Sequence, residues 1–206
     1  MSVDSYYHFH KPAPAVRPLL FLFHGTGGDE TQFVTVGSSL LPQAGIVAPR
    51  GDVSEFGAAR FFRRTGEGVY DMADLARATE KMAGFVRAHI EVAEPSAVLG
   101  LGYSNGANIL ASLIFAEPRM FDAAILMHPL IPFEPQAAAS ISTRLLLTAG
   151  RNDPICPPHM TEKLAAWLKQ ADAQTELVWH EGGHELRQEE IAAAARFFGN
   201  YSTNAK

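Results

Sequence analysis

Short apolar segments alternate with longer segments of helical periodicity along most of this chain, and this alternation limits the possible folds more than any other feature. Several of the short segments are apolar at every position. A strand buried between two layers of helices has this pattern, whereas a strand with one solvated face alternates polar and apolar residues. Repeated strand–helix units are typical of an α/β protein with a mostly parallel sheet.

The pattern predicts about seven strands, with helices on both faces of the sheet. Residues 6–9 are expected to form an antiparallel edge strand. The segment 49–69 shows no periodicity, and irregular segments of that length are often functional. The predicted parallel strands span 19–23, 46–48, 97–101, 123–127, 144–148 and 176–179. The predicted helices span 31–41, 70–90, 105–116, 158–170 and 185–198.

Composition narrows the class of protein further. The 206 residues, 47% of them hydrophobic, suit a single domain covering 1–206. Net charge is −5 and the 17 Lys and Arg residues are scattered, so we expect no nucleic-acid partner. One cysteine, Cys156, fits a reducing compartment. No apolar run reaches the ~20 residues of a membrane helix, and residues 1–15 lack the apolar core of a secretory signal. We therefore expect a cytoplasmic protein with no membrane insertion.

A G-x-S-x-G motif places a serine between a strand and a helix. Gly102-Tyr103-Ser104-Asn105-Gly106 follows the strand 97–101 and precedes the helix 105–116. In this context the motif forms a sharp turn that exposes the serine, and only small residues avoid a clash two positions to either side. A serine just before a helix can also serve only as its N-cap. The motif nevertheless predicts that Ser104 is a nucleophile.

A nucleophilic serine needs an acid and a base, which follow it in the order Asp or Glu, then His. Asp153 lies in Gly150-Arg151-Asn152-Asp153-Pro154, where the strand 144–148 opens into a loop. The alternatives are Asp172, at a helix end, and Asp122, before a strand. Position after a strand favours Asp153, although an aspartate can also simply stabilise its own turn.

The predicted base is His184. It lies in Gly182-Gly183-His184-Glu185, after the strand 176–179 and before the last helix. The carboxyl ends of parallel strands meet at one edge of a sheet, so this position brings it near Ser104 and Asp153. His180 still belongs to the strand end, and His159 lies among prolines before a helix.

The oxyanion of a tetrahedral intermediate needs donors as well. One donor is expected to be the backbone N–H of Asn105, the residue after the nucleophile. The loop after the strand 19–23 reads His24-Gly25-Thr26-Gly27-Gly28-Asp29 and offers Thr26 as the second donor. The alternative is that this segment is only a flexible glycine turn.

A zinc-protease signature overlaps the predicted base. His180-Glu181-Gly182-Gly183-His184 matches H-E-x-x-H, which binds zinc only when a helix places both histidines on one face. Two consecutive glycines cost about 1 kcal/mol each in a helix, and residues 176–179 read as a strand. We therefore predict no metal site.

The chain resembles the α/β-hydrolase superfamily, and within it the small phospholipase/carboxylesterase group of dienelactone-hydrolase-like bacterial serine esterases. The resemblance implies an α/β-hydrolase fold without a large cap domain, ester hydrolysis with no cofactor, and a homodimer as one option. Dienelactone hydrolases use a cysteine where this chain has Ser104, which argues against lactone cleavage. The resemblance rests on segments 22–30, 49–51, 60–64, 102–108, 149–154 and 182–186.

Apolar residues near the predicted site suggest walls suited to an acyl chain or an aromatic ester. Arg63 and Arg64 would bind an acidic substrate group or form structural ion pairs, and the sequence leaves both options open. Each aromatic residue could instead pack in the core. The candidate pocket residues are Phe56, Phe61, Phe62, Ile131 and Phe133.

Together these residues predict a serine carboxylesterase that hydrolyses a small-molecule ester through a Ser104–His184–Asp153 triad and an acyl-enzyme. An acyl thioesterase or lysophospholipase would use the same triad, so acyl-chain length and bond type stay open. Less favoured alternatives are a zinc hydrolase and a non-catalytic binding protein on a hydrolase scaffold.

Overall fold

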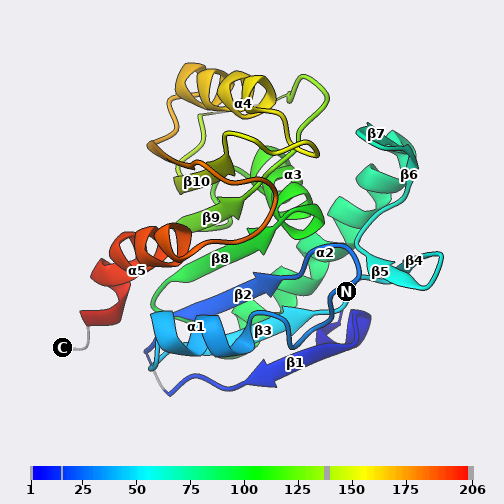
Figure 1. Cartoon of the computed structure of the whole chain (residues 1–206). Coiled ribbons are helices and arrows are strands. Elements are labelled where there is room, and N and C mark those ends of the chain that lie inside the picture. The colour runs from blue at the N-terminus through cyan, green and yellow to red at the C-terminus, as the bar shows by residue number, and fades with distance from the viewer. Residues whose placement is uncertain (1, 15, 137–139, 204–206) are drawn as a thin grey trace.

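A seven-stranded sheet forms the centre of the molecule (Figure 1). The computed structural model describes residues 2–14, 16–136 and 140–203. The strand order is β1-β3-β2-β8-β9-β10-β11, and every neighbouring pair is parallel except β1 with β3. The predicted mostly parallel sheet with an antiparallel edge strand is confirmed. The strands are β1 (His8–Lys11), β2 (Leu19–Phe23), β3 (Gly45–Pro49), β8 (Val98–Tyr103), β9 (Ala123–Met127), β10 (Arg144–Gly150) and β11 (Thr175–His180).

Helices cover both faces of this sheet, as predicted (Figure 1). Helices α1 and α5 pack together on one face, and α2, α3 and α4 cover the other. A short 3₁₀ helix, η1, precedes β1. The helices are η1 (Val3–Ser5), α1 (Val34–Leu40), α2 (Met72–Ala93), α3 (Asn105–Ala116), α4 (Pro158–Gln170) and α5 (Gln188–Thr203).

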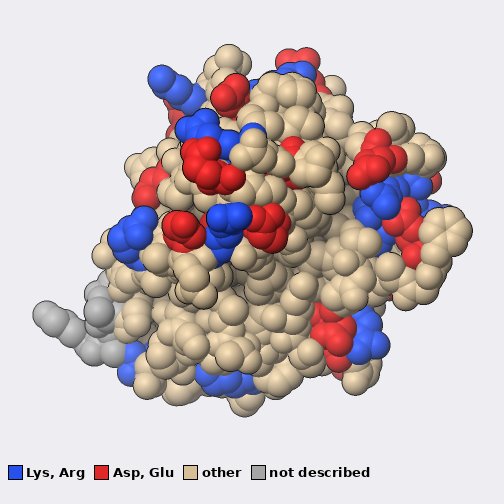
Figure 2. Space-filling view, viewed as in Figure 1, with Lys and Arg blue, Asp and Glu red and all other residues tan. Residues whose placement is uncertain are grey.

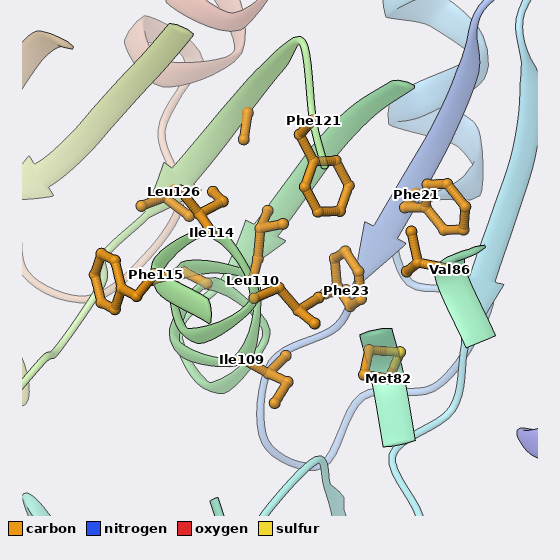
Figure 3. Close-up of a cluster of buried hydrophobic side chains, with 14 of the residues drawn as sticks. Phe21, Phe23, Met82, Val86, Ile109, Leu110, Ile114, Phe115, Phe121 and Leu126 are labelled. Atoms are coloured by element: carbon orange, nitrogen blue, oxygen red, sulfur yellow. The ribbon is translucent and has the colours of Figure 1, made fainter. Parts of the chain in front are cut away.

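Strand β2 shows why the apolar runs are continuous. All five of its residues are buried, and successive side chains point to opposite faces of the sheet. Phe21 and Phe23 join the cluster under α2 and α3, where they lie near Leu110 and Phe121 (Figure 3). Leu20 and Leu22 join the cluster under α1 and α5. The sheet therefore has a hydrophobic core on each side.

The segment 49–69 is more regular than predicted. It contains two small antiparallel ribbons, β4–β5 and β6–β7. Gly57 and Gly68 close them with φ values of +89° and +67°, a region that side-chain-bearing residues rarely adopt. The prediction of an irregular segment was wrong because ribbons this short carry too few residues to show alternation. Their strands are β4 (Val53–Glu55), β5 (Ala58–Arg60), β6 (Arg64–Gly66) and β7 (Val69–Tyr70).

The last helix differs from its predicted span 185–198 at both ends. Helix α5 begins only at Gln188 and continues through Gly199 to Thr203. The backbone N–H of Arg187 donates to the Glu190 carboxylate at 2.8 Å, which stabilises the turn before the helix. Gly199 does not end the helix, because a single helical glycine costs only about 1 kcal/mol.

Charged side chains of both signs are interspersed on the face shown in Figure 2. Several form ion pairs, among them Arg187 with Glu185 and Arg151 with Glu181. Among the described residues, no helix is both long enough and apolar enough to cross a membrane.

Candidate active site

The three predicted triad residues lie at one edge of the sheet. Ser104 directly follows β8, Asp153 lies three residues beyond the end of β10, and His184 lies four residues beyond the end of β11. These strands are parallel, so their carboxyl ends open on the same side (Figure 1). The topology thus brings together residues that are far apart in the sequence.

Ser104 occupies a strained turn between β8 and α3. Its backbone has φ +52° and ψ −116°, and its N–H donates to Met127 O at 2.9 Å. A Cβ on Gly102 would lie 2.5 Å from Gly106 O, and one on Gly106 would lie 2.2 Å from Phe23 O. Both glycines are therefore required. Ser104 stands at the N-cap position of α3, but its side chain makes no capping hydrogen bond.

The hydroxyl of Ser104 instead faces an imidazole. Ser104 Oγ lies 2.9 Å from His184 Nε2, and His184 Nδ1 lies 2.7 Å from Asp153 Oδ2. A carboxylate oxygen can only accept, so His184 Nδ1 carries the proton and Nε2 is left to accept from the serine. This is the arrangement needed to activate a serine hydroxyl.

Four hydrogen bonds hold the Asp153 carboxylate. Oδ1 accepts from the backbone N–H groups of Ile155 at 2.8 Å and Cys156 at 2.9 Å. Oδ2 accepts from His184 and also from His128 Nδ1 at 2.8 Å. Burial alone would raise the pKa of this carboxyl, but the hydrogen bonds from the two histidines hold the pKa well below its ordinary value. Asp153 is therefore a fixed anion.

None of the competing acids and bases forms a hydrogen bond or ion pair with Ser104, Asp153 or His184, among the residues that the structure describes. Asp172 and His159 are exposed, in the turn after α4 and in its first turn. Asp122 precedes β9 and accepts from Val98 N–H at 2.7 Å. His180 is buried at the end of β11.

Both predicted oxyanion donors lie beside the serine. Thr26 and Asn105 line the same cavity as Ser104. Asn105 is the first residue of α3, so its N–H has no acceptor within the helix. The side-chain Oδ1 of Asn105 accepts from Phe61 N–H at 2.8 Å, which fixes this residue against the segment after β5.

A buried histidine holds the loop that carries Thr26. His24 Nδ1 donates to Gly25 O at 2.7 Å, and Gly51 N–H donates to His24 Nε2 at 2.9 Å. These bonds require a neutral imidazole, and burial lowers the pKa of His24 accordingly. The loop is thus a fixed structure and not a flexible glycine turn.

The cavity at Ser104 has a volume of about 290 Å³, and its walls differ from the predicted ones. None of the five apolar candidates is among its lining residues. Phe61 and Phe62 are fully buried, whereas Phe56 is fully exposed at the β4–β5 turn. Ile131 and Phe133 line a separate hollow against α4. The prediction failed because the core on each side of the sheet takes up apolar side chains that lie near the motif.

Polar side chains form much of the wall of the cavity at Ser104. Arg60 donates to Thr26 Oγ1 at 2.7 Å, and Asn108 donates to the Tyr70 hydroxyl at 2.7 Å.

Arg64 also lines the cavity, with its Nε 2.9 Å from a Glu55 carboxylate oxygen. Arg63 is exposed outside the cavity. The sequence left open whether Arg63 and Arg64 form ion pairs or contact the substrate. Arg64 forms an ion pair and also lines the cavity.

A buried cluster behind Asp153 was not predicted from the sequence. His128 Nε2 lies 3.1 Å from Glu190 Oε1, and His180 Nε2 lies 3.3 Å from Glu190 Oε2. One signal was available: His128 follows β9 directly, at the same strand edge as Ser104. Glu190 gave no such signal, because an acidic residue in the first turn of a helix is common.

The same cluster resembles a metal site in residue type and spacing, as does the group His128, Asp153 and His184. However, Gly182 N–H donates to His180 Nδ1 at 3.0 Å, so the proton of a neutral His180 lies on Nε2, the atom that a metal would need. His128 and His184 likewise face carboxylates through Nδ1. Residues 181–187 are not helical, so the H-E-x-x-H segment lacks the geometry of a zinc protease. We assign no metal site.

Known proteins resemble this chain over nearly its whole length. The model of the family described as serine hydrolase (FSH1) matches residues 60–190. The protein named "Putative hydrolase MhqD" of Bacillus subtilis (strain 168) is 36% identical to this chain over 183 residues. The match covers 87% of this chain and 92% of that protein. A carboxylesterase from Bacillus cereus is 32% identical with a TM-score of 0.90, covering 95% of this chain and 94% of that one.

A protein of unknown function from Agrobacterium tumefaciens str. C58 is 56% identical with a TM-score of 0.93. That comparison covers 98% of this chain and 99% of the other. The high TM-scores to these structures, the carboxylesterase included, confirm the predicted α/β-hydrolase fold.

Proposed function

We propose that this chain, which belongs to the serine hydrolase (FSH1) family, hydrolyses small carboxylic esters through an acyl-enzyme on Ser104. The observation that carries the proposal is the unbroken hydrogen-bond chain from Ser104 Oγ through His184 to Asp153, at 2.9 and 2.7 Å. The carboxylesterase similarity supports ester bonds as the target.

In the proposed reaction His184 Nε2 takes the hydroxyl proton as Ser104 Oγ attacks the carbonyl carbon. The backbone N–H groups of Thr26 and Asn105 donate to the oxyanion, and losing one such donor costs about 2.7–4 kcal/mol in comparable sites. His184 then protonates the leaving alcohol. Water, deprotonated by the same imidazole, attacks the acyl group and releases the acid.

The cavity supports a small and partly polar substrate. Its volume of about 290 Å³ lies just below the usual range of about 300–1,000 Å³ for small-molecule sites. Arg60, Arg64 and Asn108 among its lining residues favour a substrate with a polar group near the ester. A long acyl chain would need a longer apolar wall, which disfavours lysophospholipids.

A series of p-nitrophenyl esters and matched thioesters, from two to twelve acyl carbons, tests the proposal. We expect kcat/KM to be highest for the shortest oxygen esters and to fall steadily with chain length. Ser104→Ala should abolish turnover while leaving the circular dichroism spectrum unchanged, because the nucleophile is lost but no contact in the core is. Unchanged turnover by Ser104→Ala would exclude Ser104 as the nucleophile, and a preference for thioesters or long chains would change the substrate class.

A further inference from the structure

We propose that His128 and Glu190 are positioning residues for the triad. A buried imidazolium, held between the carboxylates of Asp153 and Glu190, fixes the orientation of Asp153 and balances the charge behind His184. This inference rests on the proposed function, because it assigns roles relative to the proposed triad.

The hydrogen bonds of His128 determine its charge. Its Nδ1 lies 2.8 Å from Asp153 Oδ2, and its Nε2 lies 3.1 Å from Glu190 Oε1. Both carboxylate oxygens accept, so both ring nitrogens carry protons and the ring is an imidazolium. The side chains of all three residues are completely buried. A buried carboxylate pair without such a cation would be strongly destabilising.

The directions of the pKa shifts agree with this geometry. Burial by itself would lower the pKa of His128, but hydrogen bonds and charges from Asp153 and Glu190 raise the pKa to about 9. Burial would also raise the pKa of Glu190, but hydrogen bonds from His128 and Thr148 lower it. The ion pair therefore persists through the neutral pH range.

The net charge of the buried cluster behind His184 follows from the charges of its members. Asp153 and Glu190 contribute two negative charges, and His128 contributes one positive charge, so the buried cluster has a net charge of about −1. When His184 takes the serine proton, the positive charge on its ring balances that remaining charge. The ring centroids of His128 and His184 are 5.0 Å apart, close enough for the charge of one to affect protonation of the other.

Other groups face this cluster from every neighbouring element. Thr148 Oγ1 of β10 donates to Glu190 Oε1 at 2.5 Å. His180 of β11 and Tyr103 of β8 have ring centroids 5.3 and 5.8 Å from that of His128. Cys156 Sγ donates to His128 O at 3.2 Å, and burial raises the pKa of this thiol, so it is neutral. Burial also raises the pKa of Tyr103 to about 12. None of these groups supplies the cation that His128 provides.

The backbone of His128 is held in an uncommon conformation. Its φ is +52°, in the left-handed region that residues other than glycine rarely adopt. Such conformations cost on the order of 1–3 kcal/mol and tend to persist at functional sites. The His128 N–H donates to Thr148 O at 2.8 Å, which holds the turn in place. This backbone conformation turns the chain directly after β9, and the His128 ring then lies within hydrogen-bond distance of Asp153.

Steady-state kinetics of His128→Asn across pH 5–9 test the proposal with p-nitrophenyl acetate. Removing the buried cation favours protonation of His184, so the acid limb of the kcat/KM profile should move to higher pH by about one unit. Less firm orientation of Asp153 should lower kcat at least about 10-fold while KM stays within about twofold. Thr148→Val is the matched control, because it removes a hydrogen bond to Glu190 without changing any charge, and its acid limb should not move.

The double variant His128→Asn/Glu190→Gln separates charge from packing. It removes one positive and one negative charge, so the net charge returns to that of the wild type. The acid limb should then return to within about 0.3 pH units of the wild-type position, although kcat stays low. An unshifted limb in His128→Asn, or an equal shift in the double variant, would overturn the proposal.

A measurement on the unaltered protein avoids any folding defect of the variants. Imidazole ¹⁵N NMR should show both nitrogens of His128 protonated at pH 7. A neutral His128 ring at this pH would contradict the proposal. Fluorophosphonate labelling of the same sample tests the triad independently: without labelling the proposed function fails, whereas a neutral His128 in a labelled protein overturns only the present inference.

Discussion

At the scale of single residues, each member of the proposed triad has a different environment. Ser104 sits on a strained turn, His184 is partly exposed, and Asp153 is buried with four hydrogen-bond donors around it. The acid is thus the most firmly fixed of the three. Its replacement should therefore be the most informative single substitution after that of the nucleophile.

Asp153→Asn tests this point. An amide can donate to His184 Nδ1, which would place the imidazole proton on Nε2 and prevent it from accepting the serine proton. We expect kcat to fall about 10⁴-fold, as in a comparable triad. Asp172→Asn is the control, because Asp172 is exposed in the turn after α4, and its kcat should match the wild type. A loss of less than about tenfold in Asp153→Asn would remove Asp153 from the triad.

The sequence indicated some of these residues and not others. Ser104, Asp153 and His184 each follow a strand within a recognisable glycine-bearing motif, so their convergence could be predicted. The apolar pocket could not, because a sequence does not show whether Phe61 faces the core or the cavity. Glu190 was missed because nothing in its local sequence distinguishes a buried partner of His128 from a solvated acidic residue.

At the scale of elements, the turn between β8 and α3 positions the nucleophile. The strands could be predicted from the apolar runs, because a strand that is buried on both faces is apolar at nearly every position. The ends of α5 could not be predicted, because its start depends on a hydrogen bond between Arg187 and Glu190, and because the helix continues through Gly199 at a cost of only about 1 kcal/mol. The ribbons β4–β5 and β6–β7 could not be predicted, because their strands of two or three residues are too short to show a periodic pattern.

Gly106→Ala should disrupt this turn. Its new Cβ would meet Phe23 O at 2.2 Å, and neither backbone can move without separating α3 from β2. We expect the free energy of unfolding to fall by about 3 kcal/mol or more, with loss of esterase activity. Gly199→Ala is the matched control: its Cβ meets nothing within 4 Å in helix α5, so urea denaturation should show a gain of about 0.5–1 kcal/mol. Equal stabilities of the two variants would contradict this account of the turn.

At the scale of the whole molecule, the parallel sheet gathers four strand ends into one site. Strands β8, β9, β10 and β11 are neighbours in the sheet, and the residues that follow them supply Ser104, His128, Asp153 and His184. The site and the core therefore depend on the same strands. For that reason the buried ions of the site should affect the stability of the entire fold.

The dependence of stability on pH follows from the shifted pKa values. The pKa of His128 rises from 6.5 to about 9 on folding, so its contribution is fully present below pH 6.5 and is lost as the pH rises through about 9. The pKa of Glu190 falls from 4.5, so its contribution is present above pH 4.5 and is lost at lower pH. We expect the urea midpoint to be highest between about pH 4.5 and 6.5 and to decline toward pH 9.5. His128→Asn should lack the alkaline decline, and a wild-type midpoint that is constant from pH 6.5 to 9.5 would contradict the ion pair.

Mass spectrometry of a covalent adduct can show whether Ser104 is the nucleophile. The protein is treated with a fluorophosphonate, digested, and mapped by tandem mass spectrometry. We predict one phosphonyl group per chain, on Ser104, and none when His184→Ala is treated in the same way. An unmodified wild-type protein, or an adduct on another residue with Ser104 unlabelled, would show that Ser104 is not the nucleophile.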